Sequence, residues 1–235
     1  MAKRPIYYDT ETTGLSSQKD RIIEIAAFDP EQNRTFEEFV NPNIPIPQES
    51  TNICNITDDM VKDAPTFDII GKKFIEFCGT DTILIAHNND SFDKPFLEAE
   101  FKRADLKMPD FPFIDTLKWS RKYRPDLPKH ALQYLREMYN VEANAAHRAL
   151  NDVIILHKVF TKMIDDLDVE TVLKLLYQEK SDVVEYMPFG KHQGKKLDDV
   201  PKSYIRWLQE SEAFEKPQNT NLKKSLEKLN LLSKL

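Results

Sequence analysis

Cysteine and long apolar runs are scarce in this chain of 235 residues. Its two cysteines, Cys54 and Cys78, have no Cys-x-x-Cys partner and lie in or beside apolar sequence, so we expect both to be reduced and structural, without a zinc site. No apolar run approaches the roughly 20 residues that span a bilayer, and no signal peptide is visible. We therefore expect a cytoplasmic protein with no membrane partner.

Positive charge is outnumbered by negative charge, with 33 Lys and Arg against 39 Asp and Glu. The formal net charge is -6, which argues against a protein that coats nucleic acid nonspecifically. Between residues 118 and 129, however, five cations are set against one acid, with Trp119 and Tyr123 interleaved. Cations beside aromatic rings suit a phosphate backbone and stacked bases, but they also suit a solvated helix face whose aromatics turn inward. The candidate nucleic-acid contacts here are Lys118, Arg121, Lys122 and Arg124.

The hydrophobic pattern predicts an α/β fold, because three strands in succession are followed by alternating helices and a strand. Strands are expected at 4–9, 21–29, 35–40 and 82–86, and helices at 67–77, 94–103, 116–122, 131–139 and 148–165. An acidic junction at 165–168 indicates a boundary. The predicted organisation is a main domain over 1–166, a helical linker over 167–182 and a C-terminal module over 183–235.

Two carboxylates follow the first predicted strand, in Asp9-Thr10-Glu11-Thr12-Thr13-Gly14. In an extended chain residues i and i+2 share a face, so Asp9 and Glu11 can converge on one point. Because hard divalent metals take carboxylate oxygens as ligands, the pair is a candidate Mg²⁺ or Mn²⁺ site. The alternative is an exposed acidic turn.

Three further side chains have settings that fit such a site. Asp93 follows the strand at 82–86 and starts a helix, which it would also suit as a cap. Asp152 stands at the start of an amphipathic pattern, five residues after His147. An acid that faces inward on a packed helix is costly unless something neutralises it. The alternatives are solvent exposure for Asp152 and an ordinary cap or surface position for His147.

Taken in order, these five residues resemble the metal ligands and the histidine of the DEDDh exonucleases, the DnaQ-like group that includes polymerase proofreading subunits. The opening DTETTG and the closing segment His147-Arg148-Ala149-Leu150-Asn151-Asp152 resemble the first and last motifs of that family. The likeness spans roughly residues 4–165. Asp115, between the motifs, is not made a ligand by the resemblance, and we expect it to cap the helix that begins at Thr116.

The middle motif departs from the proofreading pattern. It has seven residues, His87 to Asp93, where proofreading subunits have six, and this spacing is similar to that of the three-prime repair exonucleases. Asp93 is therefore the expected ligand, and Asp90 is its rival.

The resemblance implies an RNase H-like mixed five-stranded sheet flanked by helices, and a metal-dependent 3′–5′ exonuclease that releases nucleoside 5′-monophosphates from DNA. Asp9, Glu11, Asp93 and Asp152 would hold two Mg²⁺ or Mn²⁺ ions about 4 Å apart. His147 would act as general base. The expected substrate contacts are Thr12, Thr13, Leu15, His87 and Asn88.

The C-terminal segment from Tyr186 to Lys196 precedes a helix-like stretch with Tyr204 and Trp207. We expect a small strand-turn-helix module with Trp207 in its core. Its glycines permit a tight turn that displays Lys191, Lys195 and Lys196 as candidate phosphate contacts. This pattern resembles the C-terminal segment of exodeoxyribonuclease X, which favours DNA repair or turnover. The closing residues 222–235 read as an amphipathic helix.

Several partners and functions stay open. The expected partner is nucleic acid with a 3′ end, DNA preferred, and a homo-oligomer is compatible with the sequence. A proofreading subunit would also bind a DNA polymerase. RNA trimming is a further alternative, because the same metals hydrolyse either backbone. A non-catalytic nucleic-acid-binding protein is the alternative from a different class.

Overall fold

The computed structural model describes residues 3–142, 149–177, 184–216 and 219–232. The chain divides into two compact units, Met1–Leu176 and Tyr177–Leu235. Within the described ranges, no helix is both long and apolar enough to cross a membrane. Both cysteines are buried and free, as expected.

A five-stranded mixed sheet forms the centre of the first unit, in the order β3-β2-β1-β4-β5. The central strand β1 pairs antiparallel with β2 and parallel with β4, which confirms the expected mixed sheet. The resemblance implied a fifth strand, but the position of β5 was not predicted, because three residues carry too little hydrophobic pattern to be recognised. The strands are β1 (Arg4–Thr12), β2 (Ile22–Asp29), β3 (Arg34–Phe39), β4 (Thr82–Ala86) and β5 (Phe113–Asp115).

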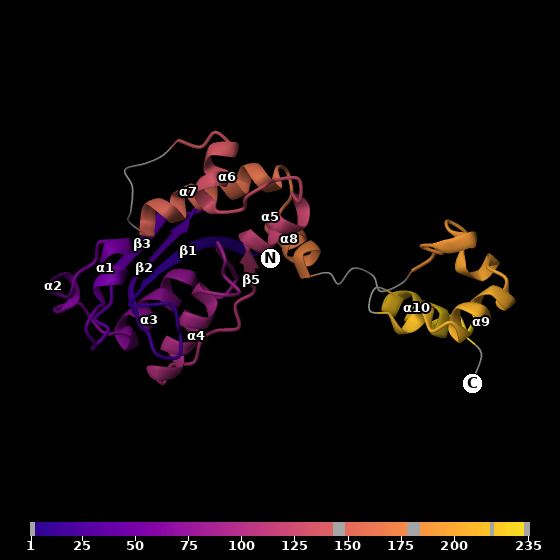
Figure 1. The fold of residues 1–235 in the computed structure, drawn as a ribbon. Coiled ribbons are helices and arrows are strands. Elements are labelled where there is room, and N and C mark those ends of the chain that lie inside the picture. The colour runs from indigo at the N-terminus through magenta and orange to yellow at the C-terminus, as the bar shows by residue number, and fades with distance from the viewer. Residues whose placement is uncertain (1–2, 143–148, 178–183, 217–218, 233–235) are drawn as a thin grey trace. The chain divides into compact units, whose positions relative to one another are not determined.

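Helices cover both faces of this sheet (Figure 1). Since side chains alternate along β1, Tyr8 packs with α3 and α4 on one face, and Tyr7 packs with α7 on the other. The helices are α1 (Gln48–Cys54), α2 (Asp58–Val61), α3 (Phe67–Cys78), α4 (Asp93–Arg103), α5 (Thr116–Tyr123), α6 (Leu132–Met138), α7 (Ala149–Ile164) and α8 (Val169–Tyr177).

The first unit ends later than the expected boundary at residue 166. Helix α8 lies in the segment expected to be a linker, yet its side chains Val172 and Leu176 are buried in the same apolar cluster as Phe160 of α7. Because burial of this stripe removes apolar surface from water, α8 packs as part of the first unit.

The second unit is small and has few regular elements (Figure 1). A single bridge, Tyr186 to Lys196, stands where a strand was expected. Two helices follow, α9 (Lys202–Glu210) and α10 (Thr220–Lys228). Their apolar faces close on a cluster that consists of Met187, Leu197, Val200, Ile205, Leu208, Phe214, Leu222 and Leu226.

Trp207 does not belong to that core, which corrects the expectation above. Its side chain is 56% exposed. The inward face of α9 is supplied by Ile205 and Leu208, which are 1% and 3% exposed, so Trp207 is left on the outer side of the helix.

Candidate functional site

The end of β1 carries the first two acids. Tyr7 packs against α7, so the alternation of the strand places Asp9 and Glu11 on the α7 side as well. In the antiparallel pair with β2, Glu11 stands opposite Glu24. The pairing register shifts directly after Glu11, an irregularity that is common where a strand must aim a side chain beside an active site.

Asp93, the first residue of α4, is fastened to the same strand. Its side chain is only 2% exposed. The backbone N and the Oγ1 of Thr10 both donate to Asp93 Oδ1, at 3.0 and 2.8 Å. The two motifs are therefore joined by a buried pair of hydrogen bonds.

The acids share one electrostatic environment. Burial raises the pKa of Asp9 well above its ordinary value, and the carboxylates of Asp93, Glu11 and Asp152 raise it further. Burial, followed by Glu24, Asp152 and Asp93, raises the pKa of Glu11 to about 7. Burial also raises the pKa of Asp93 to about 7, against the hydrogen bonds from β1, which lower it. Full ionisation of this cluster is therefore unfavourable unless a cation compensates it.

The donor chemistry of this cluster fits a hard divalent cation. The carboxylates of Asp93 and Asp152 raise the pKa of both Asp9 and Glu11, and carboxylate oxygens are the ligands that Mg²⁺ and Mn²⁺ prefer. Within the described ranges no three His, Cys, Asp or Glu side chains are already drawn together as metal ligands. His147 and the rest of 143–148 lie outside the described residues.

Asp115 organises the loop between β4 and α4. It caps α5 as expected, because its side chain accepts from the backbone N of Leu117 and of Lys118. It also accepts from the backbone N of Asn88 at 3.2 Å and of Asp90 at 3.0 Å. This buried carboxylate thus fixes the loop that leads into Asp93.

The two rivals for the middle ligand have different surroundings. Asp90 is exposed, and its Oδ2 lies 3.1 Å from Lys118 Nζ in an ion pair. Asp93 is buried, and its charge acts on Asp9 and Glu11. Its burial and its effect on the two acids of β1 favour Asp93 over Asp90 as the candidate ligand.

Glu24 is an acid of this region that the sequence analysis missed. It is 2% exposed, stands opposite Glu11 on β2 and raises the pKa of both Glu11 and Asp9. A charged residue inside the apolar run Ile22-Ile23-Glu24-Ile25 was the available signal.

A cavity of about 380 Å³ adjoins Glu11. It brings together Thr12, Thr13 and Leu15, three of the expected substrate contacts. Helix α1 closes the opposite side with Ile53, and the Oγ of Ser50 on this helix donates to the carbonyl of Thr13 at 2.7 Å. The lining residues are Glu11, Thr12, Thr13, Gly14, Leu15, Pro47, Glu49, Ser50, Ile53, Cys54 and Phe92.

The other two expected substrate contacts lie elsewhere. His87 is half-buried, with its Nδ1 2.8 Å from Thr116 Oγ1. Asn88 lines a separate cavity of about 420 Å³, together with Lys118, Arg121 and Lys122. The structure therefore does not gather His87 and Asn88 with the residues around Glu11.

The basic stretch of α5 is partly engaged within the protein. Besides the pairing of Lys118 with Asp90, Lys122 Nζ donates to the carbonyl of Leu175 at 2.6 Å, and Arg124 pairs with Asp126 at 2.9 Å. Arg121 is exposed along the rim of the cavity that Asn88 lines. This stretch therefore has features of both expected alternatives. Lys118, Lys122 and Arg124 have partners within the protein, and Arg121 lines a cavity.

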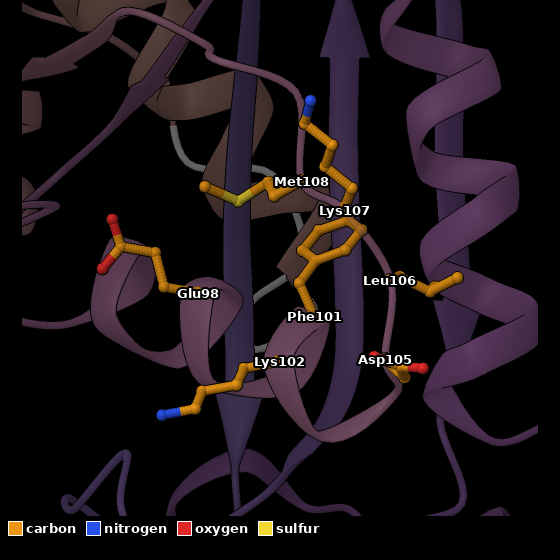
Figure 2. Close-up of a pocket in the computed structure, with 7 residues that line it drawn as sticks. All are labelled: Glu98, Phe101, Lys102, Asp105, Leu106, Lys107 and Met108. Atoms are coloured by element: carbon orange, nitrogen blue, oxygen red, sulfur yellow. The ribbon is translucent and has the colours of Figure 1, made fainter.

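A third cavity, of about 490 Å³, lies along α4 and the segment after it (Figure 2). None of the four acids lines it, so we do not assign it to the site. Its lining residues are Glu98, Phe101, Lys102, Asp105, Leu106, Lys107 and Met108.

Comparison with protein families matches both units. A model described as an exonuclease, RNase_T, matches residues 6–160. A model described as a putative quorum-sensing-regulated virulence factor matches residues 178–230. The PolC-type DNA polymerase III of Bacillus cereus is 38% identical over 165 residues. The match covers 69% of this chain but 11% of the polymerase, so the chain spans about a tenth of the length of this relative.

Solved structures share the fold of the first unit. E. coli exonuclease I in complex with a dA16 oligonucleotide has a TM-score of 0.64 at 20% identity, over 77% of this chain and 44% of that one. Exonuclease X in complex with 5′ overhanging duplex DNA has a TM-score of 0.58 at 24% identity, over 73% and 99%. The nuclease domain of 3′hExo, a DEDDh family member bound to rAMP, has a TM-score of 0.60 at 22% identity, over 70% and 93%. These likenesses confirm the expected RNase H-like fold.

Proposed function

Because the chain belongs to the RNase_T exonuclease family, we propose that it is a 3′–5′ exonuclease that hydrolyses DNA with two divalent metal ions and releases nucleoside 5′-monophosphates. One observation carries this proposal. Asp93 of α4 and Asp152 of α7 lie close enough to Asp9 and Glu11 of β1 to raise the pKa of both, beside a cavity that Glu11 lines.

Each acid has a place in the proposed chemistry. Asp9, Glu11, Asp93 and Asp152 would hold the two ions, Mg²⁺ or Mn²⁺. When bound, such ions stabilise the charge that develops on the attacking and leaving oxygens of a phosphodiester. His147 would accept the proton of the attacking water, since an imidazole titrates near neutral pH.

The cavity beside Glu11 is the proposed seat of the 3′-terminal nucleotide. Leu15 and Ile53 are 86% and 74% exposed at its rim, and they would contact the base from two sides. The hydroxyl of Thr12 is already used, because it donates to the carbonyl of Gly14 at 2.6 Å. We therefore propose that Thr12 and Thr13 shape the wall of this cavity and do not bind the nucleotide through their hydroxyl groups.

The second cavity would receive the strand that leads to the site. Lys118 and Arg121 would meet its phosphates, and Asn88, five residues before Asp93 in sequence, lies on the loop that Asp115 fixes. His87 would support this loop through its contact with Thr116. Contacts of this kind position a nucleic acid without reading its sequence.

The polarity and the substrate can be tested on the purified full chain with Mg²⁺. The substrates are single-stranded DNA, duplex DNA and RNA of one sequence, each labelled at the 5′ end in one set and at the 3′ end in another. We expect the 5′-labelled DNA to shorten by single nucleotides and the 3′-labelled DNA to lose its label at once. Loss of the 5′ label first would contradict the polarity, and faster cleavage of RNA would contradict the DNA preference.

The Asp9→Ala variant tests the proposed metal site. Removal of an outer partner of a metal ligand lowers activity 10- to 100-fold, so loss of a ligand itself should lower kcat/KM more than about a hundredfold. Asp59→Ala, which removes an acid of α2 that is 89% exposed, is the matched control and should leave kcat/KM unchanged. Mg²⁺-dependent cleavage that survives in Asp9→Ala would refute the site.

A proofreading subunit is the second candidate for the cellular role. It is favoured by the 38% identity to PolC-type polymerases, whereas repair or turnover is favoured by the resemblance of the C-terminal segment to exodeoxyribonuclease X. Copurification of the full chain with a DNA polymerase would support proofreading.

A further inference from the structure

The second unit leaves a pair of stacked aromatic rings at its surface. Tyr204 and Trp207 lie three residues apart on α9, with ring centroids 5.6 Å apart and planes inclined by 28°. Trp207 is 56% exposed, whereas the other tryptophan of the chain, Trp119, is 3% exposed. Because burial of an aromatic side chain stabilises a fold, a small unit that leaves one outside gives up stability that a partner can recover.

The tight turn at 190–196 contacts the ring of Tyr204. His192 meets the ring of Tyr204 edge-on, with centroids 4.7 Å apart, and the backbone N of Lys191 donates to Tyr204 Oη at 3.3 Å. Gly190 has a φ of 75°, and a Cβ there would lie 2.3 Å from Tyr204 Oη. Only glycine lets the turn approach the ring this closely.

The same turn displays three lysines. Lys191, Lys195 and Lys196 are exposed, and in the described part of the chain none of them forms an ion pair. The turn is held in place by its backbone, since Met187 N donates to the carbonyl of Lys195 at 2.7 Å and Gly194 N donates back to the carbonyl of Met187 at 2.8 Å. The cationic groups therefore keep their capacity for an anionic partner.

We propose that the rings of Tyr204 and Trp207, together with the lysines of the turn at 190–196, bind an unpaired strand of nucleic acid. A base would stack on the exposed face of Trp207, and the adjoining phosphates would meet the lysines. An acidic peptide would leave the rings without a stacking partner. An apolar protein surface would bury the charges of the lysines without giving them hydrogen-bond partners, which is costly. An unpaired strand offers both a π-face and regular negative charge, so it alone satisfies both halves of the surface.

This surface extends the proposed function by a second attachment point for the strand, but binding there does not require hydrolysis. The full chain is therefore tested in EDTA against oligothymidylate of about 15 nucleotides, a length that covers the usual binding sites for single strands. We expect the strand to quench the fluorescence of Trp207. Trp207→Ala should weaken binding about tenfold, whereas Trp207→Phe should retain most of the affinity, because a ring remains.

Salt dependence tests the lysines separately from the rings. Each phosphate contact to a single strand contributes about 0.7 to the slope of log affinity against log salt concentration. Lys195→Ala should lower the slope by about that amount. Lys228→Ala, which removes an exposed lysine of α10 in the same unit, is the matched control and should leave the slope unchanged.

Unchanged affinity of Trp207→Ala, with no quenching in the wild-type chain, would overturn the proposal. Equally tight binding of duplex DNA that depends on Trp207 in the same way would also overturn it, because a stacked duplex offers no free base. Hydrolysis of the p-nitrophenyl ester of thymidine 5′-monophosphate keeps the two proposals apart. Failure of the wild-type chain to cleave this small ester would count against the proposed function, whereas the binding result in EDTA would stand.

Discussion

The two units use tryptophan and charge in opposite ways. In the first unit, Trp119 is buried, with its ring 4.1 Å from that of Tyr123 and 6.4 Å from that of Phe160, and the functional charge is a cluster of acids. In the second unit, Trp207 lies at the surface beside a turn of lysines. The formal net charge of -6 thus conceals a buried cluster of acids in one unit and exposed lysines in the other. The first is the proposed site of hydrolysis, and the second is the proposed binding surface for a strand.

The largest expected difference between the units concerns Asp93. Asp93→Asn keeps an oxygen for the two hydrogen bonds from Thr10 but removes the charge, so kcat/KM on single-stranded DNA should fall more than about a hundredfold. Oligothymidylate binding in EDTA, measured by fluorescence, should stay within about twofold of the wild type, because the lysines of the second unit are untouched.

Asp90→Asn is the control for that substitution. It removes the same charge from an exposed position that pairs with Lys118, so it should change kcat/KM by less than about threefold. If Asp90→Asn is inactive and Asp93→Asn is active, the metal ligand is Asp90, and the proposed role of Asp93 is wrong.

An intermediate effect is expected when the second unit is removed. A chain that ends at Tyr177 keeps the sheet and the cluster to which α8 contributes, so hydrolysis of the thymidine p-nitrophenyl ester should be unchanged. Affinity for oligothymidylate should fall by at least about tenfold, because the stacked base is lost together with the phosphate contacts of the lysines. If the shortened chain binds as tightly as the full chain, the second unit does not hold the strand.

The smallest expected effect is on stability. The pKa of Asp93 is raised to about 7 in the folded protein, so the folded state binds more protons than the unfolded chain between the ordinary pKa and pH 7. The free energy of unfolding in EDTA should therefore decrease as pH rises through this window. In Asp93→Asn the decrease should be smaller by about 1 kcal/mol, as measured by urea unfolding at pH 6 and pH 7. An equal pH dependence in both proteins would contradict the raised pKa of Asp93.

The sheet and its helices were largely predictable because their hydrophobic patterns are long. Four strands and the helices that carry Asp93 and Asp152 lie within a few residues of the expected ranges. The family resemblance predicted the acids as metal ligands, and in the structure Glu11, Asp93 and Asp152 all raise the pKa of Asp9. His147 stays a prediction, because it lies outside the described residues.

Other features depend on contacts that a single sequence does not reveal. Glu24 was missed because its relation to Glu11 follows from strand pairing, not from spacing along the chain. Trp207 was placed in the core because large aromatics are usually buried, but eight other apolar side chains already fill that core. Helix α8 was taken for a linker because its packing partners precede it by many residues.

Thr10 stands between Asp9 and Glu11 in the sequence but points to the other face of β1, where it grips Asp93. Thr10 therefore does more than separate the two acids, because it links β1 to the first residue of α4. Because of these hydrogen bonds, a shift of β1 along its own axis would move Asp9, Glu11 and Asp93 together. The spacing of Asp9 and Glu11 is therefore set by the pleat of β1, and the position of Asp93 beside them is set by its hydrogen bonds to Thr10.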